Sequence, residues 1–308
     1  MRNASKLMTV GVLTTLLTGG VVMPAAAHDP ASATVDALER VAPDALDGNV
    51  QAPTDGVDDI PFHAELAEGD VSLPTAVGAP VTIDTPEGGI KIELPFATNQ
   101  ATAQGIAPGV VAYDNANGTT TVSSVKQAGA LQFTTVIETS AAPTEFSYDI
   151  AVPEGGSILE GTGGYFILDS DGEPVATIAA PWALDANGAS VPTRYEFAGT
   201  TLTQVVEHAS TKVVYPVVAD PKFEWFNLLP TVKLTRSETS SARTATGLAT
   251  VCGWAARTTG YLGGAVCGLN AGSIIVNANR AYGAGKCLRL LIGPGVVGGV
   301  PYKDGYCR

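Results

Sequence analysis

Histidine is scarce in this chain of 308 residues, which has three histidines in all and none in the segment 222–308. The carboxylates of that segment are also few and far apart, at Glu224, Glu238 and Asp304. General acid–base catalysis and metal binding need such groups, so this segment offers them little. The rest of the chain has no nucleophile elbow, no paired metal-ligand spacing and no lone cysteine. The sequence therefore predicts a protein without catalytic residues, cofactor or metal; a hydrolase assembled by tertiary contacts stays open as an alternative.

Basic residues are also few, with 17 Lys and Arg against 30 Asp and Glu and a net charge of −13. A nucleic-acid-binding protein normally presents a strong basic patch, so we expect no nucleic-acid partner. The charges are divided along the chain. Residues 28–221 contain 27 acidic and 5 basic residues, whereas residues 222–308 contain 3 acidic and 10 basic ones. This asymmetry predicts an acidic domain followed by a basic one.

The start of the chain has the composition of an export signal. Arg2 and Lys6 precede an apolar stretch at 7–22, and the alanines at 25–27 offer a small-residue cleavage site. This pattern predicts that residues 1–27 are a secretory signal peptide and that the protein is extracellular. An uncleaved membrane anchor is the alternative.

The acidic part reads as a β-rich domain with a loose beginning. Residues 28–61 are rich in Ala, Asp and Pro, so we expect a poorly ordered lead-in with a short helical candidate at 34–40. Over 62–221, short alternating runs with β-branched residues are separated by Gly, Asn and Asp, which is typical of an antiparallel sandwich or barrel. Three Asp-rich turns resemble fragments of calcium loops, but they lack the closing glutamate, so we interpret them as hairpin turns.

The end of this domain carries several motifs close together. They are Y-F-I-L-D-S-D-G at 165–172, A-P-W-A at 180–183, P-T at 192–193 and Y-P-V-V-A-D-P at 215–221, with Asp185, Asn187, Gly188, Val205 and His208 between them. Over Ala112 to Pro221 the chain resembles the N-terminal region of secreted actinobacterial proteins, in which a β-rich domain ends in a Y-P-V-x-A-D-P segment and a variable C-terminal module follows. The resemblance implies a secreted, processed architecture. The group has no common activity, so it implies no catalytic residue.

Single residues of these motifs also have a physical interpretation. Pro216 and Pro221 cannot donate ladder hydrogen bonds, so we expect the strand between them to end the sheet. We interpret Trp182 as a partly buried aromatic side chain and His208 as a sheet-edge imidazole, both of them structural.

The basic part contains a regular glycine pattern within 22 uncharged residues that lie between Arg257 and Arg280. Glycines at every fourth position share one helix face and let another backbone approach closely. We therefore expect a helix at 261–281 that pairs with a helix at 239–257. The glycines of this packing or membrane face are Gly260, Gly264, Gly268 and Gly272.

All four cysteines, Cys252, Cys267, Cys287 and Cys307, lie in the basic part, which predicts a local disulfide framework in a secreted chain. In an antiparallel helical hairpin that turns near Thr259, Cys252 and Cys267 lie level, so we expect them to form a bridge. Cys287 and Cys307 would then close a terminal β-hairpin with arms at 286–292 and 302–308. Four cysteines allow three pairings, and we predict this one. The expected fold class is thus α+β: a sandwich-like N-terminal domain and a small disulfide-linked helical-hairpin domain.

Two functions compete. The first is a non-enzymatic binding or surface-interaction protein with a protein or cell-surface partner. The second is a bacteriocin-like or toxin-like protein, because 22 helical residues span about 33 Å and a bilayer core is about 30 Å thick. The acidic domain would then shield a cationic domain that acts on an anionic membrane. The residues that would contact such a surface are Arg243, Arg257, Arg280, Lys286 and Arg289.

Overall fold

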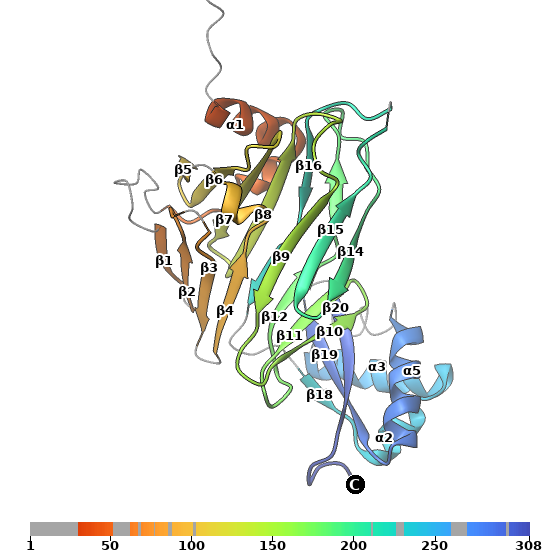
Figure 1. The fold of residues 1–308 in the computed structure, drawn as a ribbon. Coiled ribbons are helices and arrows are strands. Elements are labelled where there is room, and N and C mark those ends of the chain that lie inside the picture. The colour runs from red at the N-terminus through yellow and green to blue at the C-terminus, as the bar shows by residue number, and fades with distance from the viewer. Residues whose placement is uncertain are drawn as a thin grey trace, which may run out of the picture.

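The computed structural model describes residues 30–51, 62–66, 69–76, 78–85, 88–100, 103–210, 212–225, 231–259, 270–293 and 296–308. The predicted signal peptide at 1–27 therefore lies outside the described residues. Antiparallel strands form two large sheets and one small sheet, and a few helices accompany them (Figure 1). The two large sheets share one hydrophobic core, which confirms the predicted sandwich-like N-terminal domain.

The first large sheet has seven strands. Their order is β1 (Phe62–Leu66), β2 (Gly69–Leu73), β3 (Val81–Thr85), β4 (Gly88–Glu93), β9 (Glu145–Ala151), β15 (Thr201–Val206) and β14 (Thr193–Ala198). In β9 the buried and exposed side chains alternate strictly, as the sequence pattern predicts for a sheet with one solvated face. Its inward residues are Phe146, Tyr148 and Ile150.

The second large sheet is covered on both faces in its centre. Its main path is β10 (Ser157–Gly161), β11 (Gly164–Leu168), β12 (Pro174–Ala179), β17 (Lys222–Trp225), β8 (Ala130–Ile137), β7 (Thr119–Lys126), β6 (Val110–Asp114) and β5 (Gln104–Ala107). Two more strands, β13 (Trp182–Leu184) and β16 (Val217–Asp220), pair with each other, and β16 also pairs with β8. Every residue of β7 and β8 is buried, so both faces of these strands are covered.

Aromatic side chains fill the space between the two sheets. Phe133 of β8 contacts Tyr148 and Phe223, and each pair of ring centroids lies 5.5 Å apart. All three side chains are fully buried. Burial of each such side chain contributes about 1.5 to 3 kcal/mol, so this cluster is a main source of sandwich stability.

The outer face of the ten-stranded sheet is covered by the N-terminal helix α1 (Pro30–Val41), which leads into a 3-10 turn, η1 (Pro43–Ala45) (Figure 1). A second such turn, η2 (Ala97–Asn99), precedes β5. Leu38 of α1 is fully buried in a cluster with sheet residues such as Val122 and Val136. The expectation of a poorly ordered lead-in is therefore wrong for 30–51, because the apolar side of this helix has a sheet face to cover. The rest of the predicted lead-in, residues 28, 29 and 52–61, lies outside the described residues.

The sheet continues beyond the predicted domain end. Pro221 separates β16 from β17, yet both strands pair with β8, and the Phe133 amide donates to the Pro221 carbonyl at 3.0 Å. Proline lacks the donor but keeps its acceptor, so it interrupts the ladder without ending it. The strand that we expected to end the sheet therefore does not, and the boundary at Pro221 falls before the last strand of the sandwich.

The C-terminal unit contains the small sheet of β18 (Thr231–Lys233), β19 (Cys287–Gly293) and β20 (Val296–Tyr302), together with three described helices, α2 (Arg236–Ser241), α3 (Ala245–Thr259) and α5 (Ala271–Gly283). The single helix expected at 239–257 is wrong. Thr235 and Glu238 form a capping box that begins α2 earlier. Gly247 then lets α3 begin against the end of α2, since a Cβ there would lie 2.1 Å from the Ser241 carbonyl oxygen.

The helix expected at 261–281 corresponds in the described part to α5, which begins at Ala271 and ends at Gly283. The positions Gly260, Gly264 and Gly268 lie outside the described residues, so the helical hairpin with its glycine face stays a prediction. Gly272 is described, and a Cβ placed there would meet no described heavy atom within 4 Å.

The disulfide between Cys287 and Cys307 is present, with the two Cα atoms 5.5 Å apart, and it confirms that predicted pair. Cys267 lies outside the described residues, so its pairing with Cys252 remains a prediction. The terminal hairpin turns earlier than expected, between Gly293 and Val296, because Gly298 belongs to β20 rather than to the turn. A Cβ at Gly298 would lie 2.9 Å from the Phe166 ring, so glycine permits the strand to pass there.

The C-terminal sheet packs against strands β10 and β11 of the sandwich. Thr162 and Val297 form a bridge with two backbone hydrogen bonds of 2.7 and 3.0 Å. Beside it lies an apolar cluster that includes Phe166, Leu291 and Val296. The acidic and basic parts of the chain are therefore in direct contact.

Candidate functional site

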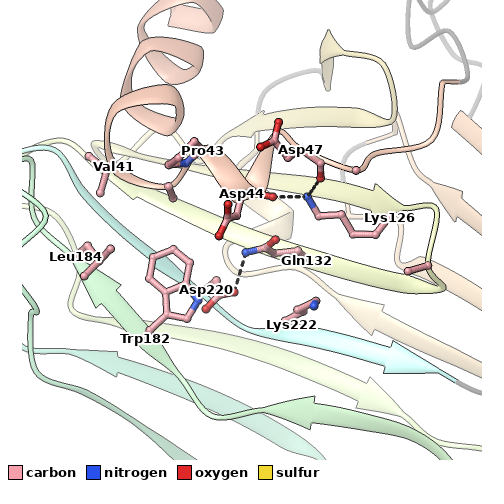
Figure 2. Close-up of a pocket in the computed structure, with 13 residues that line it drawn as sticks. Val41, Pro43, Asp44, Asp47, Lys126, Gln132, Trp182, Leu184, Asp220 and Lys222 are labelled. Atoms are coloured by element: carbon pink, nitrogen blue, oxygen red, sulfur yellow. Dashed lines mark hydrogen bonds between the residues drawn. The ribbon is translucent and has the colours of Figure 1, made fainter. Parts of the chain in front are cut away.

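A cavity of about 590 Å³ lies between the α1–η1 segment and the outer face of the ten-stranded sheet (Figure 2). Small-molecule sites usually have volumes of about 300 to 1,000 Å³. We call this cavity the α1 pocket. Its lining residues are Val41, Ala42, Pro43, Asp44, Asp47, Gly48, Lys126, Ala128, Gln132, Trp182, Leu184, Asp220 and Lys222.

Strand alternation places the polar side chains of the α1 pocket. In β8, Phe133 points into the sandwich core, so its neighbour Gln132 points to the outer face. In β16, Ala219 belongs to the core and Asp220 to the outer face for the same reason. Trp182 of β13 is directly opposite Asp220 in the ladder, so the indole and the carboxylate lie side by side.

Asp220 is the most buried charged group of the pocket, with 2% of its surface exposed. The Gln132 amide donates to its Oδ2 atom at 2.9 Å, and Figure 2 shows the carboxylate between Gln132 and Trp182. Burial raises the pKa of Asp220 to about 7, although hydrogen bonds from Gln132 and Trp182 and the charge of Lys222 oppose the rise. The carboxyl group therefore changes charge near neutral pH.

Lys126 fixes the wall of the pocket that η1 provides. Its Nζ atom donates to the carbonyl oxygens of Asp44, Ala45 and Asp47 at 2.8, 2.8 and 2.9 Å. Burial, with the nearby charge of Lys222, lowers the pKa of Lys126 to about 8, although the charges of Asp47, Asp44 and Asp220 oppose the fall. All three protons of the ammonium group are thus used within the protein.

The rest of the wall is fixed by backbone contacts with the end of β7. The Val50 amide donates to the Val125 carbonyl at 2.9 Å, and the Gln127 amide donates to Gly48 at 3.0 Å. Asn49 donates from its side chain to Ala45 and Leu46. The segment after α1 therefore behaves as a part of the sheet edge, and the pocket is preformed.

Several buried polar atoms next to the pocket have no hydrogen-bond partner in the described part of the chain. They are Asn49 Oδ1, Ser124 Oγ and Thr134 Oγ1. Ser124 is the direct ladder partner of Gln132, so its side chain lies on the same outer face. Unsatisfied buried polar atoms cost free energy, and they are tolerated most often where a site needs them.

The rim of the pocket is acidic. Asp44 and Asp47 are exposed, and neither has an ion-pair partner among the described residues. Lys222 lies 2.7 Å from Glu224, so its charge is already compensated. A ligand in the α1 pocket would therefore meet a negative potential.

The structure corrects one residue of the predicted anionic-surface set. Arg289 is 5% exposed, and its guanidinium bonds to the Glu173 carboxylate and the Gly172 carbonyl. It joins the C-terminal unit to the sandwich and is not available to a membrane. The sequence could have indicated this, because Arg289 lies in an otherwise apolar strand and a charge buried there needs a partner.

The other four residues of that set are placed differently. Arg280 and Lys286 are exposed near the end of α5, and Arg257 lies in α3. Arg243 stacks on the Tyr282 ring at 4.4 Å and donates to Asn279 at 3.0 Å. Among the described helices, none combines the length and apolar character needed to cross a membrane.

His208, which we interpreted as structural, and the calcium-like turns hold structural positions. His208 is fully buried, and its ring nitrogens lie 3.0 Å from the Tyr215 hydroxyl and 2.9 Å from the Pro143 carbonyl. In the calcium-like turns, the carboxylates of Asp114, Asp169 and Asp185 accept hydrogen bonds from the backbone amides two residues later. These contacts confirm hairpin turns.

The α1 pocket was not found from the sequence. Gln132 and Lys126 give no motif, Trp182 was interpreted as structural, and Asp220 was noticed only as part of a terminal motif. The available signal was an aspartate within an apolar strand, V-V-A-D, where burial of a carboxylate demands an explanation.

Within the described ranges, no cluster of three or more His, Cys, Asp or Glu side chains is arranged to hold a metal ion. Comparisons of the chain with protein-family models, with curated proteins and with solved structures found no match.

Proposed function

We propose that this chain is a secreted, non-enzymatic binding protein whose ligand is a small polar molecule held in the α1 pocket. The observation that carries this proposal is the buried pair of Gln132 and Asp220 beside the half-buried Trp182 ring, on the floor of a cavity of about 590 Å³. A few convergent polar groups and one aromatic face are the usual contents of a ligand site.

The surroundings of the pocket support a ligand rather than a chance hollow. Lys126 holds one wall with three hydrogen bonds, so no large rearrangement precedes binding. A preformed site loses less conformational entropy when it binds. The disulfide between Cys287 and Cys307 supports export, because such bridges persist in oxidising compartments.

A hydrolase remains the second candidate, and one observation favours it. A carboxyl group with a pKa of about 7 in a cavity has the property of a general acid. Hydrolysis needs a second group that activates water, and Asp44 and Asp47 at the rim are the other carboxylates in the lining. Product analysis with the wild-type chain separates the two functions, because a hydrolase converts a bound compound to products, whereas a binding protein releases it unchanged.

A membrane-directed function has less support in the described residues. Arg289 is unavailable, and the basic unit is docked on the sandwich by an apolar cluster. Release of dye from anionic vesicles by the full oxidised chain tests this alternative directly. No release is expected.

The test of the binding proposal uses a variant that fills the pocket. Ala128 is an exposed turn residue that lines the α1 pocket, so Ala128→Trp should occupy the cavity without disturbing the core. Ala141→Trp is the matched control, since Ala141 is an exposed turn alanine outside this lining. The purified chain and both variants are screened by ligand-observed NMR against small amines, sugars and carboxylic acids.

We expect compounds that bind the wild-type chain and Ala141→Trp but not Ala128→Trp. If every hit binds all three proteins equally, the α1 pocket is not the binding site. If no class of compound binds the wild-type chain, the proposed function fails.

A further inference from the structure

The charges of the α1 pocket restrict the ligand that it can hold; this inference rests on the proposed function. The lining contains three carboxylates, from Asp44, Asp47 and Asp220, and two ammonium groups, from Lys126 and Lys222. Both ammonium groups are engaged, Lys126 by three carbonyl oxygens and Lys222 by Glu224. The carboxylates of Asp44 and Asp47 have no ion-pair partner within the described residues. The lining is therefore short of positive charge.

The chain already seats one cation beside this cavity. The ammonium group of Lys126 donates to the carbonyl oxygens of Asp44, Ala45 and Asp47, and Figure 2 shows its bonds to Asp44 and Asp47. These oxygens are occupied by the Lys126 ammonium group, so they are not free to bind a second cation. The exposed carboxylates of Asp44 and Asp47 at the rim are what oppose an anionic ligand.

The remaining surface of the pocket suits an apolar body. The Trp182 ring and the side chains of Leu184 and Val41 line one side, and the Asp220 carboxylate lies directly beside the indole. The indole N–H edge faces the carboxylate, so the ring contributes an apolar surface for a ligand substituent, and the opposite charge of Asp220 is what attracts an ammonium group.

We propose that the α1 pocket binds an organic cation, with its ammonium group at the Asp220 carboxylate and its apolar part against Trp182. A neutral polyol would use the hydrogen bonds of Gln132 but would leave the unpaired rim charge unused. A simple metal cation would find no cluster of three ligands among the described side chains. An amine with an apolar substituent uses every feature of the lining.

The proposal has a pH signature, because the cation binds best when Asp220 is ionised. The pKa of Asp220 is raised to about 7 by burial. The ionised fraction of such a carboxyl rises about tenfold from pH 6 to pH 8, and the affinity should rise by the same factor. The titratable groups that influence Asp220 or line the same pocket are Lys222, Lys126, Tyr148, Tyr195, Asp44 and Asp47.

The experiment uses three probes of nearly equal size and different charge, namely benzylamine, benzyl alcohol and benzoate, and a neutral methyl glycoside. The 15N-labelled full chain, with its disulfides intact, is titrated at pH 6 and pH 8. The readout is the indole N–H resonance of Trp182, which is assigned by its loss in Trp182→Phe. Asp220→Asn is the test variant, and Asp171→Asn is the control, because Asp171 is an exposed carboxylate outside the pocket lining.

We expect benzylamine to shift the Trp182 resonance, with an affinity about tenfold higher at pH 8 than at pH 6. Asp220→Asn should remove this pH dependence and weaken binding at pH 8 by at least about tenfold, whereas Asp171→Asn should behave as the wild type. If benzyl alcohol or the glycoside binds as well as benzylamine, the cation proposal is wrong and the binding function stands. If benzylamine binds without any effect of Asp220→Asn, the assignment of its ammonium group is wrong. If none of the four probes shifts the resonance, the cation proposal also fails, and the broader screen with Ala128→Trp decides on the binding function.

Discussion

Replacement of Asp220 by asparagine should change how stability depends on pH. The pKa of Asp220 is about 7 in the folded chain, against 3.8 for an unperturbed aspartate. The folded state therefore holds the proton more tightly than the unfolded state does. Such a group raises the free energy of unfolding by its full amount below about pH 4, and this contribution is lost as the pH rises through 7.

The size of the effect follows from the shift. About three pKa units at 1.36 kcal/mol each give about 4 kcal/mol. Because Asp220 is 2% exposed, solvent screening reduces this value little. The wild-type free energy of unfolding should fall by about 3 kcal/mol relative to Asp220→Asn between pH 4.5 and pH 8, because part of the total is already lost below pH 4.5. Asp185 and Asp304, whose pKa values are lowered, titrate below this window. Lys126, whose pKa is lowered to about 8, is present in both proteins, so the comparison is made between chains that share its titration.

The assay is urea unfolding followed by circular dichroism at four pH values across this range. Asp44→Asn is the matched control, because Asp44 lines the same pocket but is exposed. Its difference from the wild type should vary with pH by less than that of Asp220→Asn, because an exposed carboxylate keeps its hydration in the folded chain. If the difference between Asp220→Asn and the wild type varies by less than about 1 kcal/mol over the range, burial does not control this carboxyl group.

Four further substitutions test the packing of α1 over the sheet and the packing between the two units. Leu38→Ala should cost about 2 to 5 kcal/mol in urea unfolding, because Leu38 is fully buried under α1; a cost near zero would mean that α1 does not cover the sheet. Glu173→Ala should lower the free energy of unfolding by about 3 kcal/mol, since it leaves the buried Arg289 charge with only a carbonyl partner. Arg289→Met should lower it less, because Glu173 is half-exposed and can be hydrated. Thermal unfolding measures both changes, and a larger loss for Arg289→Met would contradict the argument. Gly298→Ala should lower the free energy of unfolding by about 1 to 3 kcal/mol, because its Cβ would press on the Phe166 ring. It should also raise the rate of proteolysis between the two units. Gly305→Ala is the control: its Cβ meets nothing within 4 Å, so that rate should stay unchanged.

Local patterns in the sequence were sufficient for the sandwich. Alternation in segments such as Glu145–Ala151 identified strands because one face of that sheet is solvated. The same rule says little about β7 and β8, since every residue there is buried and polar residues such as Thr134 lie on the covered outer face. The cover itself, α1, was underestimated because its apolar residues are few and its partner strands are distant in sequence.

The disulfide and the helices show the same limit. The pairing of Cys287 with Cys307 followed from counting cysteines and elements, and it is present. The position of the terminal turn did not follow, because Gly298 is required by the Phe166 ring of another unit and not by the turn. A local sequence pattern cannot distinguish a glycine that bends the chain from one that makes room for a neighbour.

The α1 pocket depends on contacts that are distant in sequence. Lys126 binds carbonyl oxygens of residues 79 to 82 positions earlier, and Gln132 binds Asp220, which lies 88 positions later. None of these residues belongs to a short motif, and each has an ordinary neighbourhood along the chain. Their meaning arises only when the N-terminal segment covers a polar face of the sheet and removes Asp220 from water. A functional interpretation of this chain therefore has to begin with the acidic part, where burial changes the chemistry of a carboxyl group, rather than with the glycine pattern that is most conspicuous in the sequence.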